Sequence, residues 1–223
     1  MNTRRTVVIT IVAVLVIASL LILFSGCVGR QGPQALAAAE VRSYEGKDLS
    51  SVNDFRENSI KGPQYVNISE YRLTVTGLTN RTDVYTYDEV LLKYPHYTKV
   101  VTLFCVEGWD TTILWEGVLV RDLIWTAGID PRATTVIFTA NDGYTTALPL
   151  DYIVNRDILM AYRMNNVTLP AERGYPFQLV AEDKWGYKWI ETIELSDDAG
   201  YRGYWEQRGF SNTADLTKNY FTD

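Results

Sequence analysis

The chain has 223 residues and 47% hydrophobic content, enough to bury one sizeable core and to form one ordinary domain with tails. Its net charge of −6 provides no electrostatic footprint for nucleic acid, so we expect no nucleic-acid partner. The only histidine, His96, excludes His-rich metal sites, and catalysis by a Ser-His-Asp or Cys-His arrangement would need His96 itself. Because His96 lies in a turn-like stretch after Pro95, we expect it to be a surface loop residue.

The amino-terminal segment has the features of a targeting signal rather than of a folded element. Arg4-Arg5 precede the apolar run Val7–Phe24, and small residues then lead to Cys27, which is the pattern of a secretory signal peptide. The run is long for a signal and lies at the lower limit of a membrane span. Two alternatives follow: a lipoprotein in which Cys27 is lipidated after cleavage, or an uncleaved anchor. Both predict a protein tethered to the cell membrane on its extracytoplasmic face.

The remaining chain predicts one mixed α+β domain. We expect residues 1–27 to be the signal or anchor, 28–44 a tether and 45–223 the folded domain. In chain order, hydrophobic alternation and turn residues predict a strand at 71–78, a short helix at 87–94, a strand over 100–109 and a helix at 120–127 led in by 114–118. They then predict strands at 134–139 and 144–148 around a tight turn, and a helical turn at 150–155. Further strands are expected at 158–163, 176–181 and 187–195, followed by an irregular tail from 201.

The stretch Val100–Trp109 carries the most informative side chain. It is an apolar, β-branched strand that stops at Gly108 and holds Cys105 in its last turn. A thiolate at the mouth of a buried strand is a soft ligand, suited to zinc, copper or a metal that carries other sulfur donors. Taken alone, the stretch favours the simpler alternative, a free cysteine packed as a small hydrophobic residue.

A series of motifs favours a metal ligand over a packed free cysteine at position 105. They are Cys-Val-Glu-Gly-Trp at 105–109, Trp-Glu-Gly-Val at 115–118, Asn-Asp-Gly-Tyr and the residues after it at 141–150, Leu-Pro-Ala-Glu-Arg-Gly-Tyr-Pro at 169–176 with its continuation to 180, Lys-Trp-Gly-Tyr-Lys-Trp at 184–189, and 203–210. In this order and spacing they resemble the molybdopterin-binding domain of the sulfite oxidase family, which includes the catalytic subunit of the periplasmic methionine sulfoxide reductase. The resemblance covers about residues 50–215. It implies a sulfite-oxidase-type domain of mixed strands and short helices.

The resemblance also implies the metal ligand. In the family, the cysteine that corresponds to Cys105 is the only protein ligand of molybdenum, and pterin dithiolene sulfurs and oxo groups supply the other donors. A deprotonated thiol suits a soft, high-valent centre and leaves a position open for oxygen transfer. The implied cofactor is molybdenum-molybdopterin with one pterin, and nothing in the sequence distinguishes molybdenum from tungsten.

Further site residues follow from the same resemblance. The residues it places at the cofactor are Asn58, Thr139, Arg173, Lys184, Lys188 and Trp189. The structural alternatives are a loop cap for Asn58, strand filler for Thr139 and a solvated turn residue for Arg173.

Arg56 is our candidate for orienting an anionic substrate, although a surface loop arginine is the alternative. Tyr144 and Trp109 are candidates for the pocket wall, and aromatic core packing is their alternative.

The chain departs from the family pattern after Ile190. The segment there is a few residues short, and Glu191 stands where a cation would hold the pterin phosphate. Either Lys188 holds the phosphate with an altered loop, or the affinity for the cofactor is reduced.

The sequence therefore predicts a membrane-tethered molybdenum oxidoreductase that transfers an oxygen atom to or from a small sulfite- or sulfoxide-like substrate. Dimerisation and haem domains, which often accompany this domain, have no counterpart in the sequence, so we expect a separate electron carrier. Nitrate reduction is a second enzymatic alternative. The competing class is a cofactor-free cell-surface binding domain that keeps the fold.

Overall fold

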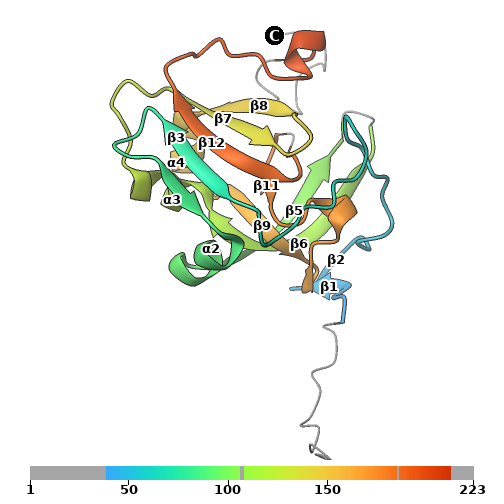
Figure 1. Cartoon of the computed structure of the whole chain (residues 1–223). Coiled ribbons are helices and arrows are strands. Elements are labelled where there is room, and N and C mark those ends of the chain that lie inside the picture. Colours follow the sequence, from blue (N-terminus) through green and yellow to red (C-terminus); the bar gives the residue numbers. More distant parts are fainter. Residues whose placement is uncertain (1–38, 106–107, 185, 212–223) are drawn as a thin grey trace, which may run out of the picture. The chain divides into compact units, whose positions relative to one another are not determined.

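Strands rich in β-branched and aromatic residues build most of the fold in the computed structural model, which describes residues 39–105, 108–184 and 186–211 (Figure 1). The first sheet contains β5 (Tyr97–Phe104), β6 (Asp110–Leu119), β9 (Leu159–Met164), β10 (Val167–Thr168) and β11 (Gln178–Val180). The second contains β3 (Leu73–Gly77), β4 (Asp83–Tyr85), β7 (Thr135–Ala140), β8 (Thr145–Pro149) and β12 (Ile190–Ser196). The short strands β1 (Ser43–Tyr44) and β2 (Lys47–Asp48) pair with each other.

The strand order explains how distant segments meet. The first sheet has the order β10-β9-β6-β5, with β11 also paired to β9, and all of its pairs are antiparallel. The second has the order β4-β3-β12-β7-β8, in which β12 runs parallel to β3 and antiparallel to β7. In the hairpin of β5 and β6, Tyr97 pairs with Gly117 and Phe104 with Asp110. This register puts Cys105 at the start of the tight loop between the two strands.

Within the part of the chain that the structure describes, three short helices pack against the main core. They are α2 (Tyr87–Lys93), α3 (Val120–Ala127) and α4 (Leu150–Asn155), and η1 (Ala171–Arg173) and η2 (Glu206–Arg208) are 3-10 turns. A capping box of Thr86 and Glu89 begins α2. Gly128, with φ of 80°, ends α3, because only glycine adopts that backbone conformation without strain. Within the described ranges, no helix is both long and apolar enough to cross a membrane.

Alternating residues of β9 connect two apolar clusters. Met160 and Tyr162 belong to the main core, which also contains side chains of β3, β7, β12 and α3. Leu159 and Ala161 belong to the smaller cluster, together with Leu103 and Trp115, and Phe55 packs against it. Because successive strand residues point to opposite faces, the first sheet is covered on both sides. The smaller cluster supports the end of β5 from which Cys105 emerges.

The expected α+β class and most expected elements are confirmed. The helices at 120–127 and 150–155 have the predicted bounds, and the helix at 87–94 and the hairpin around 141–143 are present. Four expectations need correction: the strand expected over 100–109 runs from Tyr97 to Phe104 and ends before Cys105, β6 is a ten-residue strand where only a lead-in at 114–118 is expected, the strand at 187–195 starts only at Ile190, and that at 176–181 shrinks to β11.

The folded part also starts earlier than residue 45, because the Val41 backbone N–H donates to the Asn165 carbonyl and the Glu40 carboxylate accepts from Val52 N–H. The run Val7–Phe24 and Cys27 lie outside the described residues.

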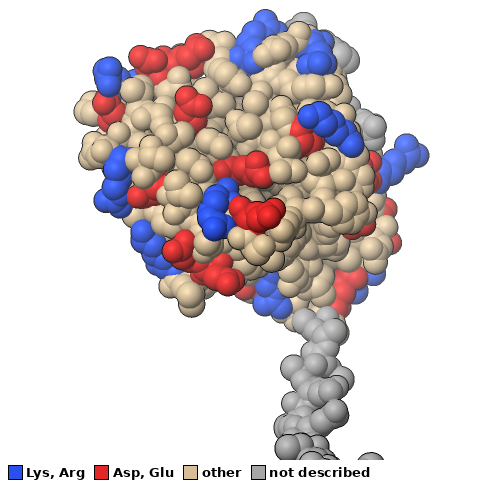
Figure 2. Space-filling model, in the orientation of Figure 1, with Lys and Arg blue, Asp and Glu red and all other residues tan. Residues whose placement is uncertain are grey.

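Charged side chains of both signs are interspersed over the face shown in Figure 2. The surface of the domain also has ion pairs such as Arg42–Asp54 (3.3 Å) and Arg132–Asp130 (3.0 Å). Pairs of this kind add little to stability because water screens them. Apolar packing is therefore the main source of stability in this domain.

Candidate active site around Cys105

A pocket of about 90 Å³, partly open to solvent, lies beside Cys105. Its walls come from the segment 55–60, the end of β5, the loop that follows it and residues 186–188, and Trp205 contributes from the carboxyl-terminal part. These segments are far apart in the sequence, and the β5–β6 hairpin brings Cys105 to their meeting point. The pocket therefore leaves open space beside the thiol.

Cys105 is held by a tight loop rather than by core packing. Its backbone N–H donates to the Trp109 carbonyl, and its carbonyl accepts from Gly108 N–H, both at 2.9 Å. The side chain is half-buried in the pocket wall. Its sulfur accepts a hydrogen bond from Nδ2 of Asn58 at 3.1 Å. The sulfur therefore faces the pocket and is not sealed in the core.

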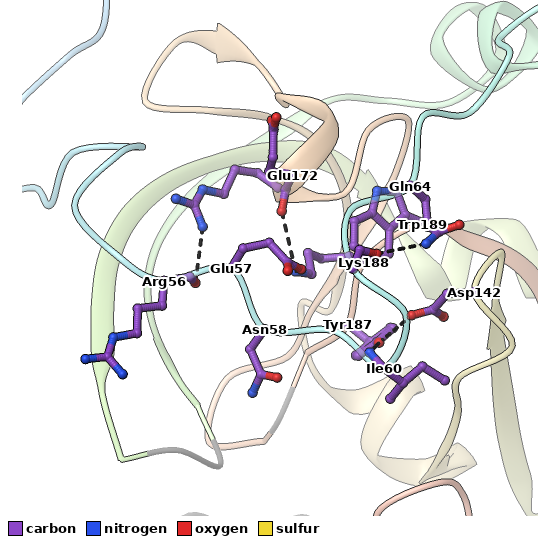
Figure 3. Close-up of polar contacts among 12 residues, drawn as sticks. Arg56, Glu57, Asn58, Ile60, Gln64, Asp142, Glu172, Tyr187, Lys188 and Trp189 are labelled. Carbon is purple, nitrogen blue, oxygen red and sulfur yellow. Dashed lines mark hydrogen bonds and ion pairs between the residues drawn. The ribbon is translucent and has the colours of Figure 1, made fainter.

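Two cationic side chains, Arg173 and Lys188, hold the segment that carries Asn58. The Arg173 guanidinium donates to the carbonyls of Val52, Phe55 and Arg56. The Lys188 ammonium donates to Oε1 of Glu57 at 2.5 Å and to the Glu172 carbonyl. Figure 3 shows Glu57 pointing toward Lys188, whereas Asn58 points away from it. Burial lowers the pKa of Lys188, and the contact with Glu57 opposes that shift.

Two buried hydroxyls in the pocket wall have no counterpart in the sequence predictions. Oγ of Ser59 and Oγ1 of Thr111 lack a hydrogen-bond partner within the described residues, and both side chains line the pocket. Buried polar atoms normally have partners, so unpaired ones in a pocket indicate a polar ligand or water. Sequence patterns give no signal for them, because one lies in an irregular segment and the other in the strand that sequence analysis misses.

Aromatic side chains form the rest of the wall. Phe55 and Trp109 lie 5.5 Å apart between ring centroids, and Phe104 is 41% exposed at the pocket. Deeper in the pocket, Tyr144 stacks on Tyr187 at 3.5 Å. The structure thus places both expected wall residues, Tyr144 and Trp109, in the pocket.

The Tyr187 hydroxyl donates to the buried carboxylate of Asp142 at 2.7 Å, and burial raises the pKa of Tyr187. A tyrosine fixed in this way keeps its proton at neutral pH. Tyr187 therefore presents a neutral, rigid ring to the pocket.

The other expected site residues divide into two groups. Arg56, Asn58, Arg173 and Lys188 line the pocket. Thr139, Lys184 and Trp189 are not among the described residues that line it. Thr139 lies in β7 between its partners in β8 and β12, and the Lys184 ammonium lies 5.5 Å from the ring centroid of Tyr152. Trp189 is fully buried and donates from Nε1 to the Ala171 carbonyl.

Arg56 is the pocket cation with the most freedom to meet a substrate. Its side chain is exposed and points away from Lys188 (Figure 3), and its backbone carbonyl accepts from Arg173. Lys188 and Arg173 are instead engaged with the protein. A substrate oxygen at the pocket mouth would therefore meet the charge of Arg56.

The protein side of a metal site is sparse here. Across the described ranges, no group of three or more His, Cys, Asp or Glu side chains is placed to hold a metal ion. A metal bound by Cys105 therefore needs further donors from a cofactor.

Comparison with known proteins identifies that cofactor. Residues 60–205 match the family described as the oxidoreductase molybdopterin binding domain. The chain belongs to this family. Uncharacterized oxidoreductase YuiH of Bacillus subtilis is 30% identical over 161 residues, which are 70% of this chain and 80% of YuiH. Membership makes the protein a molybdopterin-dependent oxidoreductase of the sulfite oxidase type.

A longer relative and a longer protein of the same fold are also similar to this chain. The protein-methionine-sulfoxide reductase catalytic subunit MsrP of Gluconobacter oxydans is 32% identical over 145 residues, 56% of this chain and 45% of MsrP. The sulfane dehydrogenase SoxCD of Paracoccus pantotrophus has the same fold, with a TM-score of 0.65 and 19% identity over 78% of this chain and 50% of its own. The chain thus spans only about half of these two proteins.

The residues present fit a molybdopterin group. A half-buried thiol, two unpaired hydroxyls and the Asn58 amide converge on one pocket, and together they match a metal that needs a soft ligand and a pterin rich in polar atoms. When bound, the group would supply two-electron redox chemistry, with Cys105 as the protein donor to the metal.

Proposed function

We propose that this protein is a membrane-tethered, extracytoplasmic molybdenum enzyme that transfers an oxygen atom, and that its substrate class is a small neutral sulfoxide. The observation that carries the proposal is the Cys105 sulfur, which faces a pocket and accepts from Asn58 at 3.1 Å. Reduction of a sulfoxide consumes two electrons and two protons and yields a thioether and water. A separate electron carrier supplies the electrons.

The chemistry of the pocket favours a sulfoxide over an inorganic anion. Phe55, Phe104 and Trp109 give the mouth an apolar surface that suits the carbon groups on a sulfoxide sulfur. Sulfite and nitrate would need several available cations, whereas Arg173 and Lys188 are engaged with carbonyls and Glu57. Arg56 alone is enough to orient one polarised S–O bond. The relative named as a methionine sulfoxide reductase subunit supports the same substrate class.

The proposal gives each of the following pocket residues a defined role. Cys105 would hold the metal, and Asn58 orients the cysteine sulfur through the N–H···S hydrogen bond. Ser59 and Thr111 offer hydroxyls to the pterin. The aromatic side chains at the mouth give the reacting oxygen a partly apolar surrounding, which strengthens the electrostatic contacts around it.

The location rests on the sequence. The apolar run Val7–Phe24 followed by Cys27 supports a tether at the extracytoplasmic face of the cell membrane, by lipid or by anchor. Membrane fractionation of the Cys27→Ser variant separates the two. Release of the domain or accumulation of an unprocessed precursor indicates lipidation, and unchanged membrane association at the same size indicates an anchor.

The deciding experiment measures metal, pterin and substrate together. The full chain is purified after native export, analysed for molybdenum, tungsten and pterin fluorescence, and assayed with a reduced dye against methionine sulfoxide, dimethyl sulfoxide, sulfite and nitrate. We expect stoichiometric molybdenum and turnover of the sulfoxides, both lost in Cys105→Ser and retained in the matched Cys27→Ser control. Absence of metal and pterin from every form would overturn the proposal in favour of a cofactor-free binding domain.

A further inference from the structure

The Arg173 side chain has unusual partners for a cation in a cofactor pocket. Its Nε donates to the Val52 carbonyl at 2.9 Å, and its two terminal nitrogens donate to the carbonyls of Phe55 and Arg56 at 2.6 and 3.2 Å. The guanidinium carbon also lies 3.8 Å from the ring centroid of Phe55. All three nitrogens are thus directed at one segment of backbone.

That segment depends on such contacts because it has no regular secondary structure of its own. Residues 52–58 form turns, bends and irregular backbone, so their carbonyls do not belong to a helix or a sheet ladder. A planar guanidinium with several donors in fixed directions is well suited to hold several carbonyls at once, and its flat face stacks on an aromatic ring. Lys188 adds a second anchor through Glu57 at 2.5 Å.

We infer that Arg173 is a positioning residue for the cysteine site: it seats the segment 52–56 and thereby holds the Asn58 amide on the Cys105 sulfur. The chain of contacts runs from Arg173 to the carbonyls of Phe55 and Arg56, and two residues further to Asn58. This role is additional to the cofactor contact that the resemblance implies for Arg173. The importance of the sulfur rests on the proposed function, but the positioning itself does not.

The test measures how accessible the Cys105 sulfur is in cofactor-free protein. The full chain in a Cys27→Ser background has one thiol, because the sequence holds two cysteines. The alkylation rate with iodoacetamide is recorded on the plateau of its pH–rate profile, so that changes in thiolate fraction do not contribute. We expect about a tenfold faster rate in Arg173→Gln, because the released segment takes the Asn58 amide off the sulfur, and the amide then no longer covers the sulfur or donates to it.

A double variant separates positioning from general destabilisation. If Arg173 acts through Asn58, Arg173→Gln adds nothing to the rate once Asn58→Ala is present, so the two effects do not multiply. Arg81→Gln is the matched control, because Arg81 also binds a backbone carbonyl, that of Thr126, in a different part of the domain. It should leave the alkylation rate within twofold of the parent protein.

Two results would overturn the inference: an unchanged rate in Arg173→Gln, or effects of the two substitutions that multiply. If Arg173→Gln does not fold, as judged by circular dichroism, Phe55→Ala replaces it, since it removes the ring under the guanidinium, and the same non-additivity with Asn58→Ala is required. Because the protein carries no cofactor in this experiment, its outcome is independent of whether the proposed oxygen-transfer activity is found.

Discussion

Asn58 and Cys105 are 47 positions apart in the chain, yet Nδ2 of Asn58 lies 3.1 Å from Sγ of Cys105. The amide donates to the sulfur, which directs the sulfur lone pairs and withdraws electron density from them. A group that contacts a metal ligand in this way influences the ligand's orientation and its basicity. The contact joins an irregular segment to the end of a strand, and the site depends on both.

The first prediction concerns this amide. Under the proposed function, in which Cys105 is the metal ligand, Asn58→Ala should lower kcat/KM for a sulfoxide about 10- to 100-fold, the usual cost of losing a partner of a metal ligand. Asn58→Asp should be at least as severe, because a carboxylate cannot donate to the sulfur and repels a thiolate. Steady-state kinetics with metal content measured on the same samples tests both. Unchanged kcat/KM in fully loaded Asn58→Ala would contradict the prediction.

The second prediction concerns Trp189, which the structure buries in the core. Trp189→Ala should reduce the free energy of unfolding by about 3–5 kcal/mol, because it removes a fully buried indole and the hydrogen bond to the Ala171 carbonyl. Trp125→Ala is the control: Trp125 is 54% exposed and its loss should cost about 0.5 kcal/mol or less. Urea unfolding measures both. Equal losses in the two variants would show that Trp189 is not a core residue.

Sequence patterns predict the helices well because local signals define them. The capping box at Thr86 begins α2 and Gly128 ends α3, at the positions expected. In contrast, β6 is missed because Asp110, Glu116 and Gly117 interrupt its pattern. A Cβ at Gly117 would lie 2.4 Å from the Met160 carbonyl oxygen, so the glycine is explained only by the neighbouring strand. No local pattern contains that information.

The site shows the same division between local and long-range information. Cys105 is predictable because its motif resembles a known family and its strand is local. The unpaired hydroxyls of Ser59 and Thr111 are not, because burial without a partner is a property of the folded pocket. The expected strand through Tyr187 and Trp189 fails for a related reason: Trp189 has φ of 56°, which no strand pattern predicts.

The third prediction concerns the ion pair behind the Asn58 segment. Lys188 and Glu57 have side chains only 12% and 24% exposed, so either charge without its partner is costly. Lys188→Met should therefore reduce the free energy of unfolding by about 3 kcal/mol. Adding Glu57→Gln should restore at least half of that loss, since no unpaired charge then remains. Chemical denaturation of the four members of the cycle gives the result, and strictly additive losses would exclude a coupled pair.

The last prediction concerns Glu206, whose side chain is 2% exposed and whose Oε2 lacks a partner within the described residues. Burial disfavours the charged form and raises the pKa of Glu206 above its ordinary 4.5. Between pH 4.5 and the raised pKa, the folded protein binds more protons than the unfolded chain, so this group makes the free energy of unfolding fall as pH rises. The Glu206→Gln variant has no ionisable group at this position, so its free energy of unfolding does not fall with pH for this reason.

The difference in unfolding free energy, Glu206→Gln minus the unmodified protein, should therefore increase as pH rises from 4.5, by about 1.4 kcal/mol for each unit by which the pKa is raised. Glu89 provides a control of opposite sign, because the hydrogen bond from the Thr86 backbone N–H lowers the pKa of Glu89. The stability that the Glu89 carboxylate contributes is therefore present above pH 4.5 and is lost as pH falls through the lowered pKa. Glu89→Gln should thus be less stable than the unmodified protein at pH 7 and approach it at low pH. Urea titrations from pH 3 to 8 measure both differences, and a flat difference for Glu206→Gln would show that this carboxyl is not buried against ionisation.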